Sequence, residues 1–142
     1  MTNEINEFIG KYHFLSNFYE CNVEYGGIIY NNSEAAFQAQ KASDDEIKII
    51  FSNLTPSLAK KLGRNIRLRH DWREIRDDVM YEVCMAKFKQ NDDLRKLLID
   101  TGDAVLIEGN TWRDGYWGVY KGKGKNKLGL TLMKVRRELS KE

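Results

Sequence analysis

The sequence is poor in the side chains that build metal centres and disulfide frameworks. Its 142 residues include 2 histidines and 2 cysteines. Cys21 and Cys84 are too few for a disulfide framework and lack the spacing of a zinc knuckle. No cluster of carboxylates suits a phosphate-cleaving metal cage either. We therefore expect a reduced, intracellular protein that uses no metal and no cofactor.

Motif signatures of several enzyme classes are missing as well. The sequence has neither the P-loop spacing nor the dinucleotide-binding glycine fingerprint. It also lacks a G-x-S-x-G elbow, which leaves Ser/His/Asp hydrolysis poorly supported. The N-terminus is polar, and no apolar run reaches the roughly 18 residues that a membrane span needs. A soluble, cytoplasmic protein with no membrane partner is expected.

Proline is almost absent, with 1 residue, whereas 42% of the residues are hydrophobic. A chain of this composition can bury a core and contains no long linker. Its length is about that of one ordinary domain, so we predict a single domain over residues 1–142. Residues 21–31 predict a β-hairpin around Gly26-Gly27, because a two-residue turn needs positive φ.

Signals for helices follow one another along the rest of the chain. Capping boxes are expected at Ser43–Glu46 and Asp71–Glu74, and Asn91 is expected to cap a further helix. Apolar residues with helical spacing predict helices over residues 43–54, 56–63, 71–89, 91–102 and 128–139. Residues 104–108 predict a short strand. The fold class is therefore α+β and mainly helical, with packed helices and a small antiparallel sheet.

The helix expected directly after the hairpin carries a polar face. Asn32 or Ser33 can accept hydrogen bonds from its first turn. At 100° per residue, the side chains of Glu34, Gln38 and Lys41 fall on one narrow face. A carboxylate, an amide and an amine then project together. A solvated helix face with no function is the alternative interpretation.

Residues 111–129 differ in composition from the rest of the chain. They hold four aromatic residues, five glycines and five basic residues, with Asp114 as the single acid. Glycines let a backbone approach a ligand closely, and the helix that follows presents N–H groups to an anion. Lysines suit phosphate, and aromatic rings offer faces on which a base can stack. The alternative is a mobile, solvated loop with a generic preference for nucleic acid.

A site for phosphate and base beside a carboxylate and an amine suggests chemistry on a ribosyl phosphate or nucleotide. Cleavage at the anomeric carbon of the sugar needs few groups. A carboxylate such as Glu34 can stabilise the oxocarbenium-like charge and move protons. An amine such as Lys41 can instead attack that carbon and hold the opened sugar as a Schiff base.

Several motifs occur in the order that is typical of one known family. The sequence resembles the NADAR family, also called YbiA-like, from about Phe14 to Leu139. The matching motifs are Phe14-Leu15-Ser16-Asn17-Phe18, Ser33-Glu34 with Phe37-Gln38-Ala39-Gln40-Lys41, Leu62-Gly63-Arg64, Asp71-Trp72, Ala86-Lys87-Phe88, and Trp117-Gly118 followed by Gly122, Gly124, Asn126 and Leu128-Gly129. The resemblance implies a mainly helical α+β fold and metal-independent hydrolysis of N-glycosidic bonds to phosphorylated ribose.

The resemblance also implies roles for individual residues. Glu34 would be the acid/base carboxylate, Lys41 the amine of a Schiff base, and Asp114 a second catalytic or sugar-orienting carboxylate. The implied substrate-binding residues are Asn17 and Gln38 for ribose or base, Trp72 and Trp117-Gly118 for the pocket wall, and Arg64, Lys123 and Asn126 for phosphates. Structural roles compete for three of them: Trp72 as a core anchor, Arg64 at a helix C-terminus and Asn17 in a turn.

One departure from the family pattern affects the mechanism. Many relatives have histidine where this chain has Ala35. If that histidine assists proton transfer in them, another group does so here or the substrate differs. His70 and His13 are candidate replacements.

The expected function is removal of ADP-ribose from guanine in nucleic acid or nucleotide, with the ADP-ribosyl conjugate as partner. The same chemistry on early riboflavin-pathway intermediates is the first alternative. A non-catalytic module that binds ADP-ribose or nucleic acid is the second, and it belongs to a different class. The oligomeric state stays open.

Overall fold

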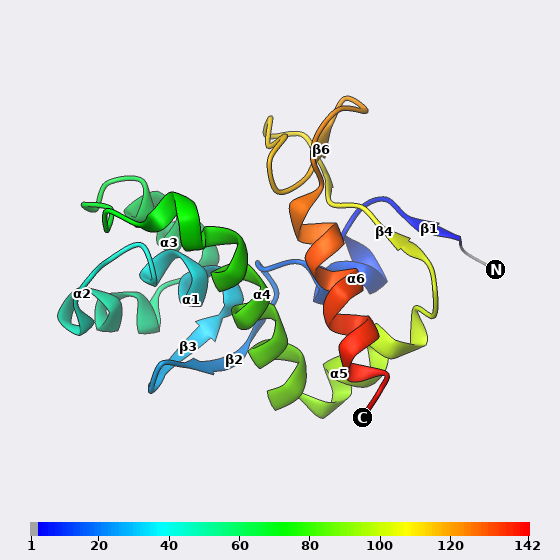
Figure 1. Ribbon diagram of the computed structural model, residues 1–142, viewed down its shortest axis with the longest axis horizontal. Coiled ribbons are helices and arrows are strands. Elements are labelled where there is room, and N and C mark those ends of the chain that lie inside the picture. The colour runs from blue at the N-terminus through cyan, green and yellow to red at the C-terminus, as the bar shows by residue number, and fades with distance from the viewer. Residues whose placement is uncertain (1–2) are drawn as a thin grey trace. The chain divides into compact units, whose positions relative to one another are not determined.

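The structure is a computed structural model, and it describes residues 3–142 (Figure 1). The chain separates into two compact units, of which one is Asn17–Asn91 and the other joins the N-terminal segment up to Ser16 with Asp92–Glu142. Helices predominate and the sheets are small, which confirms the mainly helical α+β prediction. No helix within residues 3–142 is long and apolar enough to cross a membrane.

The unit 17–91 contains the predicted hairpin. Strand β2 (Glu20–Tyr25) pairs antiparallel with β3 (Ile28–Asn32). Gly26 and Gly27 form the turn with φ of +60° and +83°, which residues other than glycine rarely adopt. Val23 and Tyr30 face each other across the hairpin and are completely buried. The prediction of this hairpin is confirmed.

Helix α1 (Ser33–Ala39) follows the hairpin, and every one of its residues is buried. The Asn32 side chain caps it by accepting a hydrogen bond from the Ala35 N–H at 2.7 Å. The prediction that the helix continues to Lys41 is wrong, because it ends at Ala39. The Gln40 side chain donates to the Ala36 carbonyl at 3.0 Å, and the chain tightens there into i→i+3 hydrogen bonds.

The next helix differs from its prediction. Helix α2 (Asp45–Ile50) is capped by Asp44, whose carboxylate accepts from the Ile47 N–H at 3.0 Å, and not by Ser43. None of its residues is buried, and a short 3₁₀ turn, η2 (Phe51–Asn53), replaces its expected last turn. The chain must leave the helical conformation there because Thr55 precedes a proline and caps the helix that follows.

Helix α3 (Pro56–Gly63) is confirmed as predicted, with the Thr55 hydroxyl accepting from the Leu58 N–H at 3.3 Å. Helix α4 (Trp72–Gln90) confirms the long helix but not its capping box. The Asp71 carboxylate does not cap it, because Arg69 binds both carboxylate oxygens at 2.6 and 3.2 Å. That hydrogen-bonded pair lowers the pKa of Asp71.

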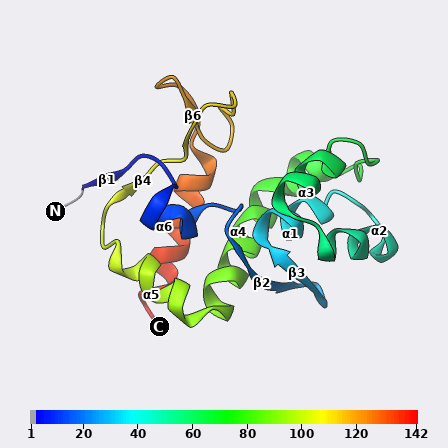
Figure 2. The same cartoon turned by 180° about the vertical axis from the view of Figure 1, so that it is seen from behind.

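The other unit is built from short parallel strand pairs and two helices. Strand β1 (Glu4–Ile5) pairs with β4 (Val105–Leu106), and β5 (Gly109–Asn110) pairs with β6 (Val119–Tyr120). The helices are α5 (Asp92–Asp100) and α6 (Lys127–Leu139), and a 3₁₀ segment, η1, spans Gly10–Leu15. In both ribbon views β1 and β4 lie side by side (Figure 2). The strand predicted at residues 104–108 and the last helix are confirmed. The parallel pairing of these short strands was not predicted.

Asn91 and Gly129 make close contacts next to α5 and within α6. The Asn91 side-chain N–H donates to the Lys87 carbonyl at 2.8 Å and to the Asn22 carbonyl at 3.0 Å, which ties the end of α4 to strand β2. The expected cap on α5 by the Asn91 oxygen stays a prediction. Helix α6 approaches β4 so closely that a Cβ on Gly129 would lie 2.1 Å from the Leu106 carbonyl oxygen. A glycine is therefore required at that position.

Candidate active site

The first part of the candidate site lies on α1. Glu34 and Gln38 are one helical turn apart and retain 9% and 7% of their exposure. The Gln38 side-chain N–H donates to the Glu34 carboxylate at 2.7 Å. A hydrogen bond of this kind favours the ionised form of a carboxylate. The structure therefore confirms that these two side chains project together.

The other end of the Gln38 amide is unusual. Its carbonyl oxygen is buried and finds no hydrogen-bond partner among the described residues. An orphaned buried acceptor of this kind costs about 1–3 kcal/mol. The amide keeps this orientation because the opposite one would turn its oxygen toward the Glu34 carboxylate. The Gln38 amide thus orients the Glu34 carboxylate through its N–H group, while its own carbonyl oxygen lacks a hydrogen bond.

Gly63, at the end of α3, makes room for that amide. A Cβ at this position would lie 2.0 Å from the Gln38 carbonyl oxygen and 2.8 Å from its Cδ. No side chain larger than hydrogen fits without moving Gln38. The sequence suggested Gly63 only as a helix stop, so its contact with the site was missed. The signal was its place beside Arg64 in a family motif.

Lys41 lies in the turn that follows α1, yet its amine still belongs to the same electrostatic group. Burial lowers the pKa of Lys41, the Glu34 charge raises it, and the nearby cations Arg64 and Lys60 lower it further. An amine with a lowered pKa is more often neutral, as a nucleophile must be. The carboxylate and the amide are thus joined by a hydrogen bond on α1, and the amine lies in the turn after α1, within electrostatic range of the carboxylate.

The remaining predicted residues of this unit surround α1. Asn17 holds the start of the helix, because its carbonyl accepts from the Glu34 N–H at 3.1 Å and its side chain accepts from the Ser33 hydroxyl at 2.9 Å. Trp72 is 6% exposed, and its ring centroid lies 5.2 Å from that of Phe37. These contacts give both residues structural roles. They leave the roles in substrate binding as predictions, as for the exposed Arg64.

The structure places the other predicted residues in the second unit. The Asp114 carboxylate accepts from the N–H groups of Tyr116 and Trp117 at 3.0 and 2.9 Å. The Asn126 side chain accepts from the Glu108 N–H at 3.0 Å and donates to the Leu106 carbonyl at 2.9 Å. Asp114 therefore shapes the backbone of the loop that connects β5 to α6, and Asn126 ties the end of that loop to the segment before β5. Their predicted contacts with substrate stay predictions.

Gly118 and Lys123 belong to the same loop. Gly118 is buried, and a Cβ there would lie 1.9 Å from a carboxylate oxygen of Glu108. Lys123 is exposed, and its backbone exchanges hydrogen bonds with Tyr120 at 2.8 and 3.0 Å. The charged side chain of Lys123 thus projects from a turn whose backbone is held by hydrogen bonds.

The start of α6 does not offer the anion site that the sequence suggested. The N–H groups of residues 126, 127 and 128 donate to the carbonyls of residues 118, 116 and 117 at 3.3, 3.1 and 2.9 Å. Because these donors are already used, an anion cannot bind them at the same time. The prediction that these three N–H groups are free for an anion is therefore wrong.

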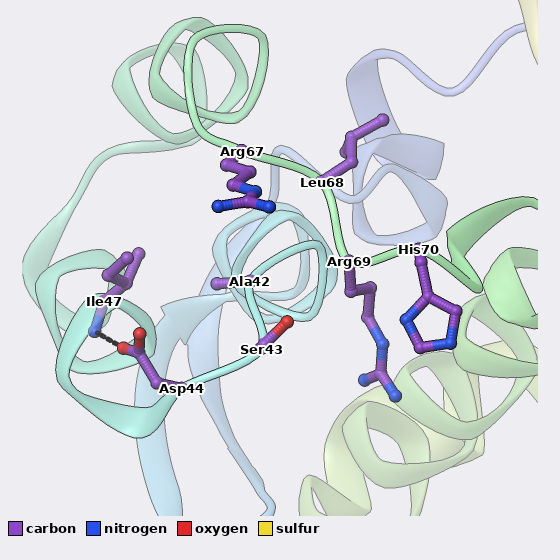
Figure 3. A pocket seen from close by; sticks show the side chains of 8 residues that line it. All are labelled: Ala42, Ser43, Asp44, Ile47, Arg67, Leu68, Arg69 and His70. Carbon is purple, nitrogen blue, oxygen red and sulfur yellow. Dashed lines mark hydrogen bonds between the residues drawn. The ribbon is translucent and has the colours of Figure 1, made fainter.

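Neither histidine lies on α1. His70 is exposed and lines a pocket of about 320 Å³ between residues 42–47 and 67–70 (Figure 3). This pocket starts one residue beyond Lys41, whose carbonyl accepts from the Arg69 N–H at 2.8 Å. His13 is exposed in the other unit. Within residues 3–142 there is no group of three or more His, Cys, Asp or Glu side chains placed to hold a metal.

The protein is a mainly helical α+β protein whose helix α1 buries a carboxylate held by an amide, and the turn after α1 carries an amine with a lowered pKa. The chain belongs to the NADAR family, because the NADAR domain matches residues 6–140. This confirms the resemblance that the motifs indicated.

The similar proteins agree with this assignment. The chain is 39% identical over 132 residues to the N-glycosidase YbiA of Shigella boydii, which covers 90% of this chain and 82% of that protein. It is 37% identical to an N-glycosidase of Nostoc punctiforme, covering 90% and 86%. It is 39% identical to a riboflavin biosynthesis protein of Vibrio vulnificus, covering 89% of this chain and 35% of that protein. The NMR structure of the Escherichia coli protein YbiA matches with a TM-score of 0.86 and 36% identity, covering 99% and 87%.

Proposed function

We propose that this protein is an N-glycosidase that hydrolyses the bond between a base and a phosphorylated ribose. The observation that carries the proposal is the buried Glu34 carboxylate, oriented by Gln38 beside the amine of Lys41. The names of the relatives support the class of reaction, since two of them are N-glycosidases. Glu34 and Lys41 supply a carboxylate and an amine, the groups that such chemistry needs.

In this mechanism Glu34 stabilises the positive charge that develops on the anomeric carbon and transfers protons. Water finally supplies a hydroxyl group to that carbon and a proton to the departing base nitrogen. Lys41 has two possible roles. Its protonated amine can act only as a positive charge near the ribose, or its neutral amine can form a Schiff base with the opened sugar. The methyl side chain of Ala35 cannot exchange a proton, so we assign proton transfer to Glu34.

We propose ADP-ribosylated guanine, in nucleic acid or as a nucleotide, as the substrate. Arg64 and Lys60 are close enough to the Lys41 amine to lower its pKa, and a group of three cations suits the pyrophosphate of ADP-ribose. For Asp114, Trp117, Gly118, Lys123 and Asn126, which lie in the other unit, the roles in substrate binding are proposed from the family motif alone.

The test is a product assay by mass spectrometry without added metal. The protein is offered an oligonucleotide that carries ADP-ribosylated guanine, and a parallel tube contains borohydride. Released ADP-ribose with an intact oligonucleotide is the expected result. A borohydride-trapped adduct that is lost in Lys41→Ala would identify the amine as the nucleophile. If no ADP-ribose is released, ADP-ribosylated guanine is excluded as the substrate.

A second candidate is the same reaction on an early intermediate of riboflavin biosynthesis. The similarity to the riboflavin biosynthesis protein of Vibrio vulnificus favours it. The same assay with these intermediates separates the two candidates. If neither substrate is cleaved, a non-catalytic module for ADP-ribose or nucleic acid is the function that remains.

A further inference from the structure

The loop of residues 111–125 brings two basic segments together. Strands β5 and β6 are parallel, with Gly109 opposite Val119 and Asn110 opposite Tyr120. The residues that follow each strand therefore leave the pair at the same end. The Lys125 N–H donates to the Gly115 carbonyl at 2.8 Å, which holds the two segments side by side. Figures 1 and 2 show the loop extending beyond the start of α6.

The exposed charged side chains of this loop are all cationic, and its single acid, Asp114, is half-buried. Trp112 is 55% exposed. Arg113, Lys121 and Lys125 are exposed as well. The ammonium groups of Lys121 and Lys125 lie 5.4 and 5.3 Å from the ring centroids of tyrosines 120 and 116, so aromatic contacts restrict where these charges stand.

The side chain of Asn110, at the end of β5, ties the first part of the loop to that strand. The Asn110 amide donates to the Asp114 carbonyl at 2.9 Å and accepts from the Asp114 N–H at 3.0 Å. Among residues 3–142, the non-glycine residues with positive φ are Arg113, Lys121 and Asn126, and all three lie in or next to this loop. A surface fixed in this way loses little conformational freedom when it binds a partner.

We infer that Trp112, Arg113, Lys121 and Lys125, here named the loop surface, bind a strand of unpaired nucleic acid. A base stacks on Trp112, and the phosphates contact the three cations. Binding of this strand is a function beyond cleavage of one glycosidic bond, and it does not depend on the chemistry at Glu34. Within residues 109–128, Trp112 is the single large apolar side chain that is exposed. One such side chain offers too little apolar surface to bind a lipid bilayer.

The test measures binding of an unmodified, fluorescent single-stranded oligonucleotide by anisotropy, with DNA and RNA as separate arms. We expect Trp112→Ala to weaken binding by about 5- to 150-fold and Trp112→Phe to restore most of it, because a phenyl ring still stacks. Lys121→Glu with Lys125→Glu should weaken binding and lower the dependence of log K on log salt by about 1.4, since each phosphate contact contributes about 0.7.

The matched control is Lys96→Glu, which reverses an exposed lysine on α5 outside the loop. Circular dichroism melts establish that each variant is folded. Equal losses in Lys96→Glu and in the loop variants, or unchanged affinity in both loop variants, would overturn the inference. So would binding to anionic phospholipid vesicles without binding to either oligonucleotide. Because the oligonucleotide is unmodified, failure here is distinct from failure of the glycosidase proposal.

Discussion

Helix α1 and the loop that follows β5 are both rich in polar side chains, but they use them differently. On α1 the polar groups are buried and bind one another, and one acceptor on Gln38 is left without a partner. In the loop, Asp114 and Asn126 are used to fold the backbone, while the charged side chains stand in solvent. Buried polar groups suit chemistry, whereas exposed cations on a fixed backbone suit binding.

The largest expected effect tests the buried region at its carboxylate. Glu34→Gln should lower kcat by about 10²- to 10³-fold, the scale of acid/base catalysis and of charge stabilisation. The measurement is turnover of the substrate found in the product assay. Glu74→Gln, an exposed residue on α4, is the matched control. A folded Glu34→Gln protein with nearly full turnover would exclude Glu34 from the reaction.

A second prediction concerns Lys87, a lysine that is 1% exposed in the same unit. Burial lowers its pKa from 10.5 to about 8, and the thiols of Cys21 and Cys84 oppose that shift. Between about pH 8 and 10.5 the unfolded chain binds a proton there that the folded protein does not. The free energy of unfolding should therefore rise with pH across this window, by on the order of 3 kcal/mol.

Urea unfolding at several pH values checks this expectation. Lys87→Met should remove the rise, because methionine fills similar space without a charge. Lys89→Met replaces an exposed lysine on the same helix and should keep the rise. If both variants keep it, burial of Lys87 has no such effect on stability.

The third prediction breaks the contact that orients the carboxylate. Gly63→Ala should displace the Gln38 amide, cost about 1–3 kcal/mol of stability through overpacking, and lower kcat by about 10-fold. It should also move the acidic limb of the pH–rate profile to higher pH, because Glu34 loses a donor that favours its ionised form. Loss of stability without a change in the pH profile would make Gly63 purely structural.

The matched control is Gly115→Ala in the loop. A Cβ there would meet the Gly124 Cα at 3.9 Å, which is ordinary contact. We expect little change in kcat or in the pH profile from this substitution, which adds the same methyl group outside the buried region.

The two regions also differ in how far the sequence could predict them. The hairpin, α3 and α6 follow from local signals such as Gly26-Gly27 and Thr55-Pro56, and these predictions are confirmed. The wrong predictions concern the end of α1 and the cap of α4, where a side chain binds an unexpected partner. The Gln40 side chain binds the Ala36 carbonyl where α1 ends, and Arg69 binds the Asp71 carboxylate that was expected to cap α4. Such choices depend on tertiary neighbours and have no local signature.

The candidate site shows the same division. The proximity of Glu34 and Gln38 follows from helical spacing alone. The contact of Gly63 with Gln38 could not be predicted, because it joins two helices across more than twenty residues of chain. Likewise, nothing local in residues 116–128 indicates that the first N–H groups of α6 are already used by the loop.

The smallest expected effect separates the two roles of Asp114. Asp114→Ala removes the acceptor of two N–H groups and should cost about 1 kcal/mol of stability, as the loss of a cap does. Asp114→Asn keeps an acceptor oxygen and should cost less, measured by thermal melts of both variants. If Asp114 only folds the loop, Asp114→Asn keeps turnover. If its charge also acts on the sugar, Asp114→Asn loses turnover while it keeps stability, and the loop then shares the chemistry that the buried region is proposed to perform.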